Sequence, residues 1–411
     1  MAVSSRAQDA VGAQQRHPKA WLTLGLLVAA WTVDYMDRQN INVLFPLIGK
    51  ELGLSLATLG GVVSAYLYAY TFIAPVAGAA SDRFGRRAIL IPGLIFYSIT
   101  TFFSGLAVNA SSLFATRALT GVGAGTHFPV AAAYVADLFP ERERGRAMGI
   151  HQIGFGLGAI LGPTLAIALA LHWGWRVSFF LYVIPGLVVA GLIWLLAPEV
   201  VQKKSAATYW KDVRSVLSWR LVPFMVTQAV ALFVLWMYYT WVPLYAIKTL
   251  HIGLFHSGLF GTIVPGMAII SQPLGGWVSD KIGRRNALLI SFGVSLLMIL
   301  VLPFARAPWE LVTVLACVGM ANWFTPVTFS YIGDLYREAR GTASSVVEFA
   351  GFFFGGAPAP FIIGAIAQHF GFRTAFTIGT VLLVIGFTVT FTLLRRSVVE
   401  MPTGGLAPAT A

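Results

Sequence analysis

Charged residues are scarce in this chain of 411 residues. Asp, Glu, Lys and Arg make up 11% of it, and hydrophobic residues make up 57%. A water-soluble domain carries about 25% charged residues, so this composition excludes a large soluble fold. Cysteine is nearly absent as well: Cys317 stands alone, which excludes an intramolecular disulfide and a zinc cage built from cysteines. The chain also lacks a His-Glu-x-x-His motif and a phosphate-binding loop, so we expect neither an enzyme nor a bound cofactor.

Long apolar segments, in contrast, recur twelve times along the chain. Most of them are long enough to cross a bilayer, and several contain Gly and Pro, which bundled membrane helices tolerate. We therefore expect an all-α membrane protein with twelve transmembrane helices. The expected spans are 20–48, 57–80, 88–108, 111–139, 146–170, 175–197, 219–247, 256–279, 287–305, 308–335, 342–367 and 373–395.

The basic residues are unequally divided between the two sets of loops. One set, together with both tails, holds 21 of the 28 Lys and Arg residues, the other set holds five, and Arg38 and Arg117 lie inside spans. The positive-inside rule places the richer side and both termini in the cytoplasm, which agrees with an even number of spans. We expect the inner membrane of a bacterium. The net charge of +12 then reflects topology and attraction to lipid heads, so lipid and not nucleic acid is the expected partner.

The chain repeats in two halves. The stretch Gly78-Ala-Ala-Ser-Asp-Arg-Phe-Gly-Arg-Arg87 recurs 198 residues later as Gly276-Trp-Val-Ser-Asp-Lys-Ile-Gly-Arg-Arg285. Trp210, Val213 and Leu217 in the connection between the halves have helical spacing, which predicts an amphipathic helix at the membrane surface. Two such repeats imply a site at their interface near the midplane, reached by rocking one half on the other. The predicted division is a tail 1–19, a six-helix bundle 20–198, a linker 199–218, a six-helix bundle 219–396 and a tail 397–411.

The first span carries three charged residues, Asp34, Asp37 and Arg38, which share one helix face. A charge within a span costs roughly 3 kcal/mol on insertion scales, so this face should not meet lipid. One interpretation is a helix-packing ion pair between Asp34 and Arg38 at i,i+4. The other, which we favour, is a site that binds substrate and carries protons.

Arg117 lies in the fourth span, about two turns from its outer end. It could extend toward the outer surface, but its depth favours the interior. Arg38 should reach a similar depth, and two guanidiniums at one level form a site for a carboxylate. Aromatic and amide side chains suit the body of an organic acid, although many of them will simply pack helices. The predicted substrate contacts are therefore Arg38, Arg117, Asn42, Tyr66, Tyr70, Trp236, Tyr239 and Asn322.

The repeated Gly-x-x-x-Asp-Arg/Lys-x-Gly-Arg-Arg stretch resembles the signature loop of the major facilitator superfamily, and the stretch from Arg117 to Gly125 resembles another motif of that superfamily. The resemblance implies two pseudo-symmetric six-helix bundles and an inner gate in which an Asp pairs with an Arg. A conformational change can break such a pair. The alternative is a basic membrane anchor with a tight Gly turn. The predicted gate residues are Asp82, Arg83, Arg86, Asp280 and Arg284.

Two families within the superfamily share motifs with the chain. Asp37-Arg38-Gln-Asn-Ile41 resembles the first helix of anion:cation symporters, and Asp34-x-x-Asp37 resembles that of aromatic acid:proton symporters. Both imply an organic anion moved with protons. The first family has a glutamate seven residues after the fourth-span Arg, where this chain has Ala124, so that proton route does not carry over intact. The candidate proton carriers are Asp34, Asp37, Glu348 and His127. A lone membrane histidine, such as His127 or His151, more often packs through hydrogen bonds.

We therefore predict a monomeric secondary transporter that imports an organic anion, such as a mono-carboxylic, sugar or aromatic acid, together with protons. The alternative is a proton-driven exporter of drugs or metabolites. A glycine-rich stretch from Gly154 to Pro163 resembles an exporter motif, but Thr164 and Leu165 follow where a Gly pair would be expected. Close helix packing explains that stretch better.

Overall fold

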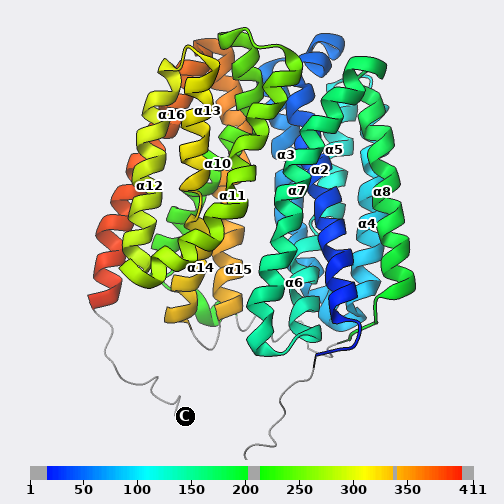
Figure 1. Cartoon of the computed structure of the whole chain (residues 1–411), viewed down its shortest axis with the longest axis vertical. Helices are drawn as coiled ribbons and strands as arrows, with labels where there is room; N and C mark the ends of the chain where they lie inside the picture. The colour runs from blue at the N-terminus through cyan, green and yellow to red at the C-terminus, as the bar shows by residue number, and fades with distance from the viewer. Residues whose placement is uncertain (1–15, 202–212, 337–339, 400–411) are drawn as a thin grey trace, which may run out of the picture.

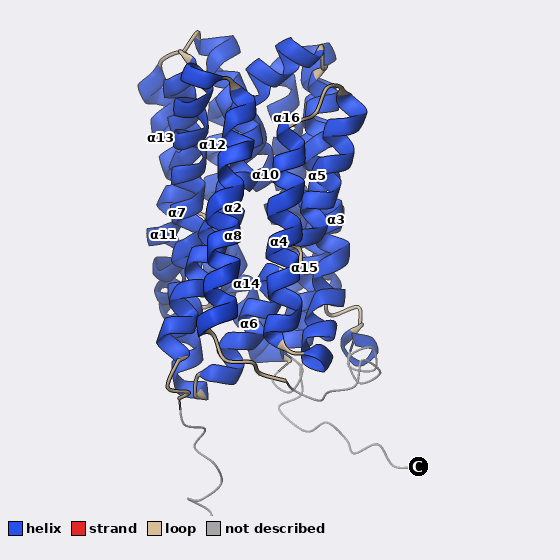
Figure 2. Ribbon diagram, turned by 90° about the vertical axis from the view of Figure 1, so that its right-hand side faces the viewer, coloured by secondary structure: helices blue, strands red, loops and turns tan. Residues whose placement is uncertain are grey.

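The computed structural model describes residues 16–201, 213–336 and 340–399, and these residues form helices and connecting turns without any strand. Two bundles stand side by side, with α2 to α8 in one and α10 to α16 in the other (Figure 1). The helices of both run along the same long axis, as the view turned by 90° also shows (Figure 2). The prediction of an all-α membrane fold with two six-helix bundles is confirmed.

The N-terminal half contains six spans, of which the fourth is built from two helices. At the break, the backbone N–H of Thr126 donates to the carbonyl of Gly123 (3.2 Å), three residues back, and the Thr126 hydroxyl donates to the same carbonyl (2.8 Å). The expected single helix over 111–139 is therefore two shorter ones. The helices are α2 (Ala20–Leu52), α3 (Leu56–Phe84), α4 (Arg86–Gly105), α5 (Ala110–Ala124), α6 (His127–Leu138), α7 (Glu141–Trp173) and α8 (Trp175–Leu196).

The C-terminal half repeats this plan, and its fourth span is again divided. Its last two spans join at Gly371, whose φ of 80° is a conformation that glycine adopts at little cost. Of the predicted amphipathic linker helix, residues 202–212 lie outside the described residues. The elements are α10 (Val222–Leu250), α11 (Leu254–Ile282), α12 (Arg284–Val301), η1 (Leu302–Phe304), α13 (Pro308–Met320), α14 (Phe324–Leu335), α15 (Arg340–Gly351), the π-helix η2 (Phe352–Gly356) and α16 (Pro358–Val399).

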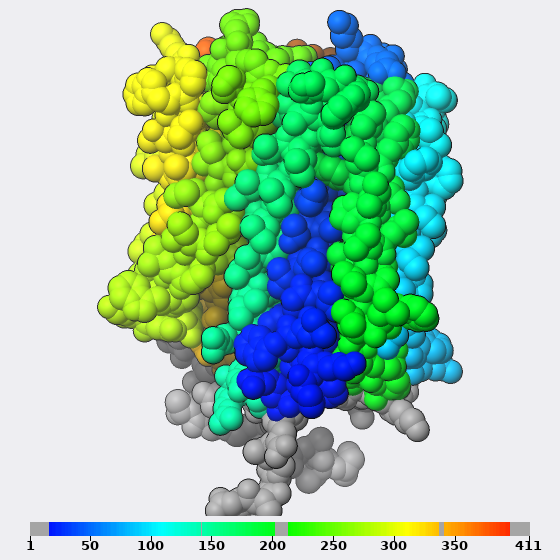
Figure 3. All heavy atoms as spheres, turned by 45° about the vertical axis from the view of Figure 1, so that its right-hand side comes forward, coloured from blue at the N-terminus to red at the C-terminus, as the bar shows by residue number. Residues whose placement is uncertain are grey.

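The two halves touch at one end of the molecule, opposite the two repeated Asp-Arg/Lys-x-Gly-Arg-Arg loops. There the Phe361 N–H of α16 donates to Ser64 Oγ of α3 (3.2 Å), and the Ala57 N–H of α3 donates to Gln368 Oε1 of α16 (3.3 Å). A Cβ at Gly60 would collide with the Pro360 carbonyl, so glycine is what lets α3 approach α16 this closely. Figure 3 shows α7 and α11 in contact at this end and apart at the other, which we call the basic end.

Where the halves separate, a cavity of about 600 Å³ lies between them. Residues of α3, α6, α15 and η2 line it, and Asp82 and Leu217 line it at the basic end. The fold therefore gives access to the space between the halves from the basic end and closes it at the other.

Candidate functional site

Four charged side chains are buried in the core of the N-terminal half: Asp34, Asp37 and Arg38 of α2, and Arg117 of α5. Each has at most 2% of its surface exposed. Arg38 Nη2 lies 2.8 Å from Asp34 Oδ2, one helical turn away, and Arg117 Nη1 lies 2.7 Å from Asp37 Oδ2 on the neighbouring helix. The first ion pair was one of the two interpretations of the sequence, whereas the second, between helices, was not foreseen.

The two ion pairs leave part of the hydrogen-bonding capacity unused. Arg38 Nε and Nη1, Arg117 Nε and Asp37 Oδ1 are buried without a hydrogen-bond partner among the described residues. Leaving a buried polar group unpaired costs about 1–3 kcal/mol. The cluster can therefore donate further hydrogen bonds to a polar group, and three of the four free atoms are guanidinium nitrogens, which suit an anion.

Aromatic rings surround both guanidiniums. The Arg38 guanidinium carbon lies 4.5 Å from the ring centroid of Tyr70 and 5.3 Å from that of Tyr66, within the range of cation–π attraction. The Arg117 guanidinium lies 5.1 Å from the same Tyr66 ring. The Tyr66 hydroxyl also donates to Asp34 Oδ1 (3.3 Å). Tyr66 thus joins the two ion pairs into one site.

This charged cluster lies behind the wall of the cavity. Its four charged side chains are not among the lining residues, but Tyr70, which packs on Arg38, is. Across the cavity, Phe352 of η2 packs at 5.6 Å from Tyr70, and Glu348 of α15 accepts a hydrogen bond from Gln228 Nε2 (2.8 Å). The structure therefore brings Glu348 to the wall of the access path, on the side of the C-terminal half.

The other predicted substrate contacts lie partly in the C-terminal half and partly on α2. Trp236 and Tyr239 are buried and pack on each other at 5.9 Å, and Trp236 also contacts Phe352. The Asn42 amide donates to Gln39 Oε1 (2.9 Å) beside the charged cluster on α2.

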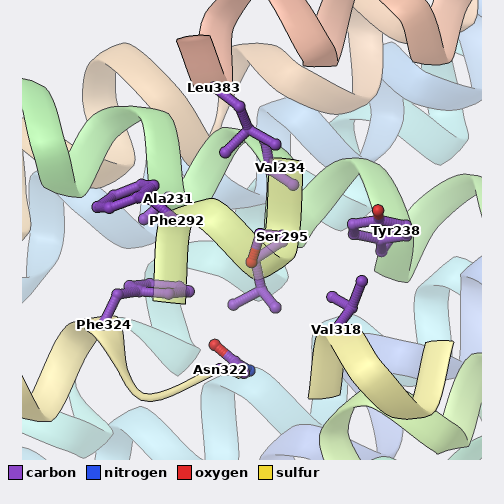
Figure 4. A pocket seen from close by; sticks show the side chains of 10 residues that line it. Ala231, Val234, Tyr238, Phe292, Ser295, Val318, Asn322, Phe324 and Leu383 are labelled. Carbon is purple, nitrogen blue, oxygen red and sulfur yellow. The ribbon is translucent and has the colours of Figure 1, made fainter. Parts of the chain in front are cut away.

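Asn322 lines a separate cavity inside the C-terminal half, together with Tyr238 and Ser295 (Figure 4). At about 20 Å³ it has the size for one water molecule, so it is too small for an organic acid. The sequence could not show that Asn322 lines this small cavity and not the larger one. Asn322 lies at the break between α13 and α14, where a regular helical period does not predict the direction of a side chain.

The predicted gate residues form ion pairs inside each half. Arg86 lies 2.5 Å from Asp82 and 2.7 Å from Asp137, and Arg284 lies 2.5 Å from Asp280 and 3.3 Å from Asp334. The Arg83 guanidinium is exposed and rests on the Phe84 ring at 5.2 Å. In this conformation, with the basic end open, the described contacts of these arginines hold each half together and do not join one half to the other.

His127 lies beside the cluster, at the start of α6, and pairs with a histidine of α7. Its Nε2 atom is 3.3 Å from Nε2 of His151, and both rings are buried. The sequence indicated His127 and His151 each as a separate residue and gave no signal for their contact, since 24 residues separate the two along the chain.

Comparison with known proteins places the chain among membrane transporters. The family model described as Major Facilitator Superfamily matches residues 27–308 and 255–409. A D-galactonate transporter of Escherichia coli is 27% identical over 92% of this chain and 96% of its own length. A multidrug resistance protein of Escherichia fergusonii is 26% identical over 95% of this chain and 97% of its own length. A bacterial homolog of the human lysosomal transporter Spinster, solved inward-facing and unoccupied, has the same fold, with a TM-score of 0.79 at 17% identity over 97% of this chain and 100% of that chain.

Proposed function

The chain belongs to the major facilitator superfamily, and we propose that it imports an organic anion together with protons. The observation that carries this proposal is the buried cluster in which two guanidiniums, each paired with one carboxylate, keep free nitrogen donors. A carboxylate substrate offers the same chemistry as the carboxylates that hold the guanidiniums now. The relative that transports D-galactonate, itself an organic acid, supports the same substrate class.

The two ion pairs suggest how protons are coupled to the anion. Protonation of Asp34 or Asp37 removes its negative charge and releases the hydrogen-bonding face of Arg38 or Arg117 for the substrate carboxylate. Loss of the proton restores the ion pair and expels the anion. Because each exchange keeps the buried charge constant, the cluster avoids an uncompensated charge at every step. Glu348 on the cavity wall is a second candidate carrier for a proton on its way to the cytoplasm.

The aromatic residues around the cluster would hold the body of the acid. Tyr66 and Tyr70 already pack on the guanidiniums, and Trp236 and Tyr239 would meet the substrate from the C-terminal half when the halves close. Asn42 and Asn322 would contribute amide contacts, the second only after a movement at the break between α13 and α14.

We further propose that the basic end faces the cytoplasm of a bacterial inner membrane and that a single chain is the transporting unit. The distribution of Lys and Arg supports this orientation, in which the cavity is open to the inside. Closure there would rearrange the loops that hold Asp82, Arg83, Arg86, Asp280 and Arg284. Labelling of a terminal tag from outside intact cells would overturn the orientation.

The decisive experiment measures binding of organic acids to the purified protein and to an Arg117→Ala variant. Removing one partner of a buried charged contact costs about 2–5 kcal/mol, so affinity should fall by about 30-fold or more. Arg117→Lys should restore it only in part, because lysine lacks the bidentate fork. Arg176→Ala is the matched control, because Arg176 is a partly exposed arginine at the start of α8 that pairs with Glu51 and not with the buried cluster.

Arg117→Ala also leaves Asp37 without its partner, which could lower the yield of folded protein. The double variant Arg117→Ala/Asp37→Ala removes both charges and keeps the test valid. If either well-folded variant binds every tested acid as the parent protein does, the anion site is wrong. The relative named as a multidrug resistance protein supports the alternative, an exporter, which would then bind neutral or cationic compounds instead.

A further inference from the structure

A pair of buried histidines lies one aromatic ring away from the charged cluster. His127 begins α6, directly after the break in the fourth span, and His151 lies on α7. Their rings stack at 5.5 Å and 13°, with 3.3 Å between the two Nε2 atoms, and their exposed fractions are 1% and 0%. The scheme of proton and anion exchange given above does not need either residue.

The geometry of the pair fits one shared proton. Two neutral imidazoles at this distance can form one hydrogen bond, in which one Nε2 donates and the other accepts. A further proton converts one ring into an imidazolium. The Nδ1 atoms of both rings are buried without a partner among the described residues, so a bare nitrogen is present to receive that proton.

Trp31 provides a surface that tolerates the added charge. Its ring stacks on His127 at 4.9 Å and 10°, and on His151 at 5.6 Å and 23°. The face of an indole is the aromatic surface that attracts cations most strongly. Phe128 lies at the edge of the same group, and the neutral side chain of Gln152 adjoins His151.

The same Trp31 ring connects the pair to the proposed substrate site. The Arg38 guanidinium lies 5.6 Å from the Trp31 centroid and is the charged group of α2 that acts on His127. Its positive charge opposes a second positive charge on the histidines. Asp34 already pairs with that charge, so an anion that binds at Arg38 while Asp34 stays ionised adds one negative charge beside the histidines. A proton on the pair compensates this added charge, so anion binding and proton binding at the pair then favour each other.

We propose that His127 and His151 together form a proton-binding site, which takes up one proton when an organic anion binds at Arg38. This inference rests on the proposed function, because it requires an anion at the arginines. The histidine pair is then a proton site in addition to the acids of α2. Trp31, which contacts both Arg38 and the histidines, connects the anion site to this proton site.

The test counts protons taken up when the ligand binds. Purified protein in weakly buffered solution with a pH indicator is mixed with an organic acid that binds it, at several pH values from acidic to neutral. His127→Gln and His151→Gln should each bind the acid but take up about one proton fewer per ligand than the parent protein. His256→Gln, an exposed histidine at the start of α11, is the matched control and should match the parent.

Unchanged proton uptake in both glutamine variants would overturn the proposal. A parent protein that binds no organic acid would instead reject the proposed function, so the two failures are distinguishable. If the variants do not fold, isotope-labelled histidine in the unmodified protein gives a second readout by NMR. Two histidine ring signals should shift when the ligand is added, and an absence of such shifts would also overturn the proposal.

Discussion

The two halves of the molecule share a fold but differ in where they bury charge. Among the described residues, every Asp, Lys and Arg that is buried lies in the N-terminal half, namely Asp34, Asp37, Arg38, Arg86 and Arg117. In the C-terminal half, the corresponding interior holds hydroxyl and amide side chains such as Gln228 and Thr227, with Glu348 half-buried at the cavity wall. One half thus carries the charges that we assign to the proposed anion site, and the other carries a mostly neutral surface opposite them.

The repeated loop motif shows the same asymmetry at a second place. The Arg86 side chain is 3% exposed, and that of its counterpart Arg284 is 26% exposed. Their Asp partners differ in the same way, at 33% and 7% in the first half against 66% and 60% in the second. The same Arg and Asp residues of the motif are therefore less exposed to water in the N-terminal half, where each ion pair should contribute more to stability.

The largest difference between the halves should follow from deleting one acid in each. Asp37→Ala leaves the Arg117 guanidinium buried without a partner, which should cost about 3–5 kcal/mol of stability. Glu348→Ala removes a partner of the neutral Gln228 amide and should cost about 1–2 kcal/mol. Thermal midpoints and yields of monodisperse protein in detergent measure both.

The double variant Asp37→Ala/Arg117→Met is the control for this comparison. It should be more stable than Asp37→Ala alone, because it removes the orphaned charge. Equal losses of stability for Asp37→Ala and Glu348→Ala would contradict the view that the buried charges distinguish the halves.

A smaller difference is expected for the two motif arginines. Arg86→Ala breaks contacts with Asp82, Asp137 and the Ser81 hydroxyl, most of them shielded from water, and should cost about 2–3 kcal/mol. Arg284→Ala breaks the equivalent but exposed contacts and should cost about 0–1 kcal/mol. The measurement is the shift of the thermal midpoint at low and high salt. Similar shifts for the two variants, or a strong salt dependence of the Arg86 effect, would be inconsistent with the burial difference.

The sequence predicted the spans, the two bundles and the inward-facing charges of the first helix, because these follow from hydropathy, repetition and helical period. It could not predict which acid Arg117 meets. That depends on how α5 is turned against α3, and Gly121 sets this contact: a Cβ there would collide with the Tyr66 carbonyl. The partner Asp37 is 80 residues away along the chain, and no local pattern connects the two.

The histidine pair was missed for the same reason. His127 and His151 belong to helices whose relative position depends on glycine packing of α7 against α2, where Gly154 lies against the Val28 carbonyl and the Trp31 Cβ. Trp31 and the histidines meet only once that close approach exists. The sequence predicted which buried side chains carry charges or protons, but it could not predict which of them contact each other across helices.

The smallest effect should come from the charge that the C-terminal half places on the access path. Glu348 lines the cavity beside Tyr70, so its carboxylate repels an entering anion. A unit charge about 10 Å away in a hydrated cavity contributes about 0.4–0.8 kcal/mol, so Glu348→Gln should raise anion affinity about two- to fourfold. At low pH the parent carboxyl is itself protonated and neutral. The ratio of the two affinities should therefore approach one as the pH falls and be largest at high pH.

Binding isotherms across this pH range measure the ratio. Glu310→Gln is the control, because Glu310 lies at the end away from the basic end and glutamine can keep its cap on the Arg306 N–H. If Glu348→Gln lowered affinity at every pH, the carboxylate would be a substrate contact, and the C-terminal half would be more than a neutral surface.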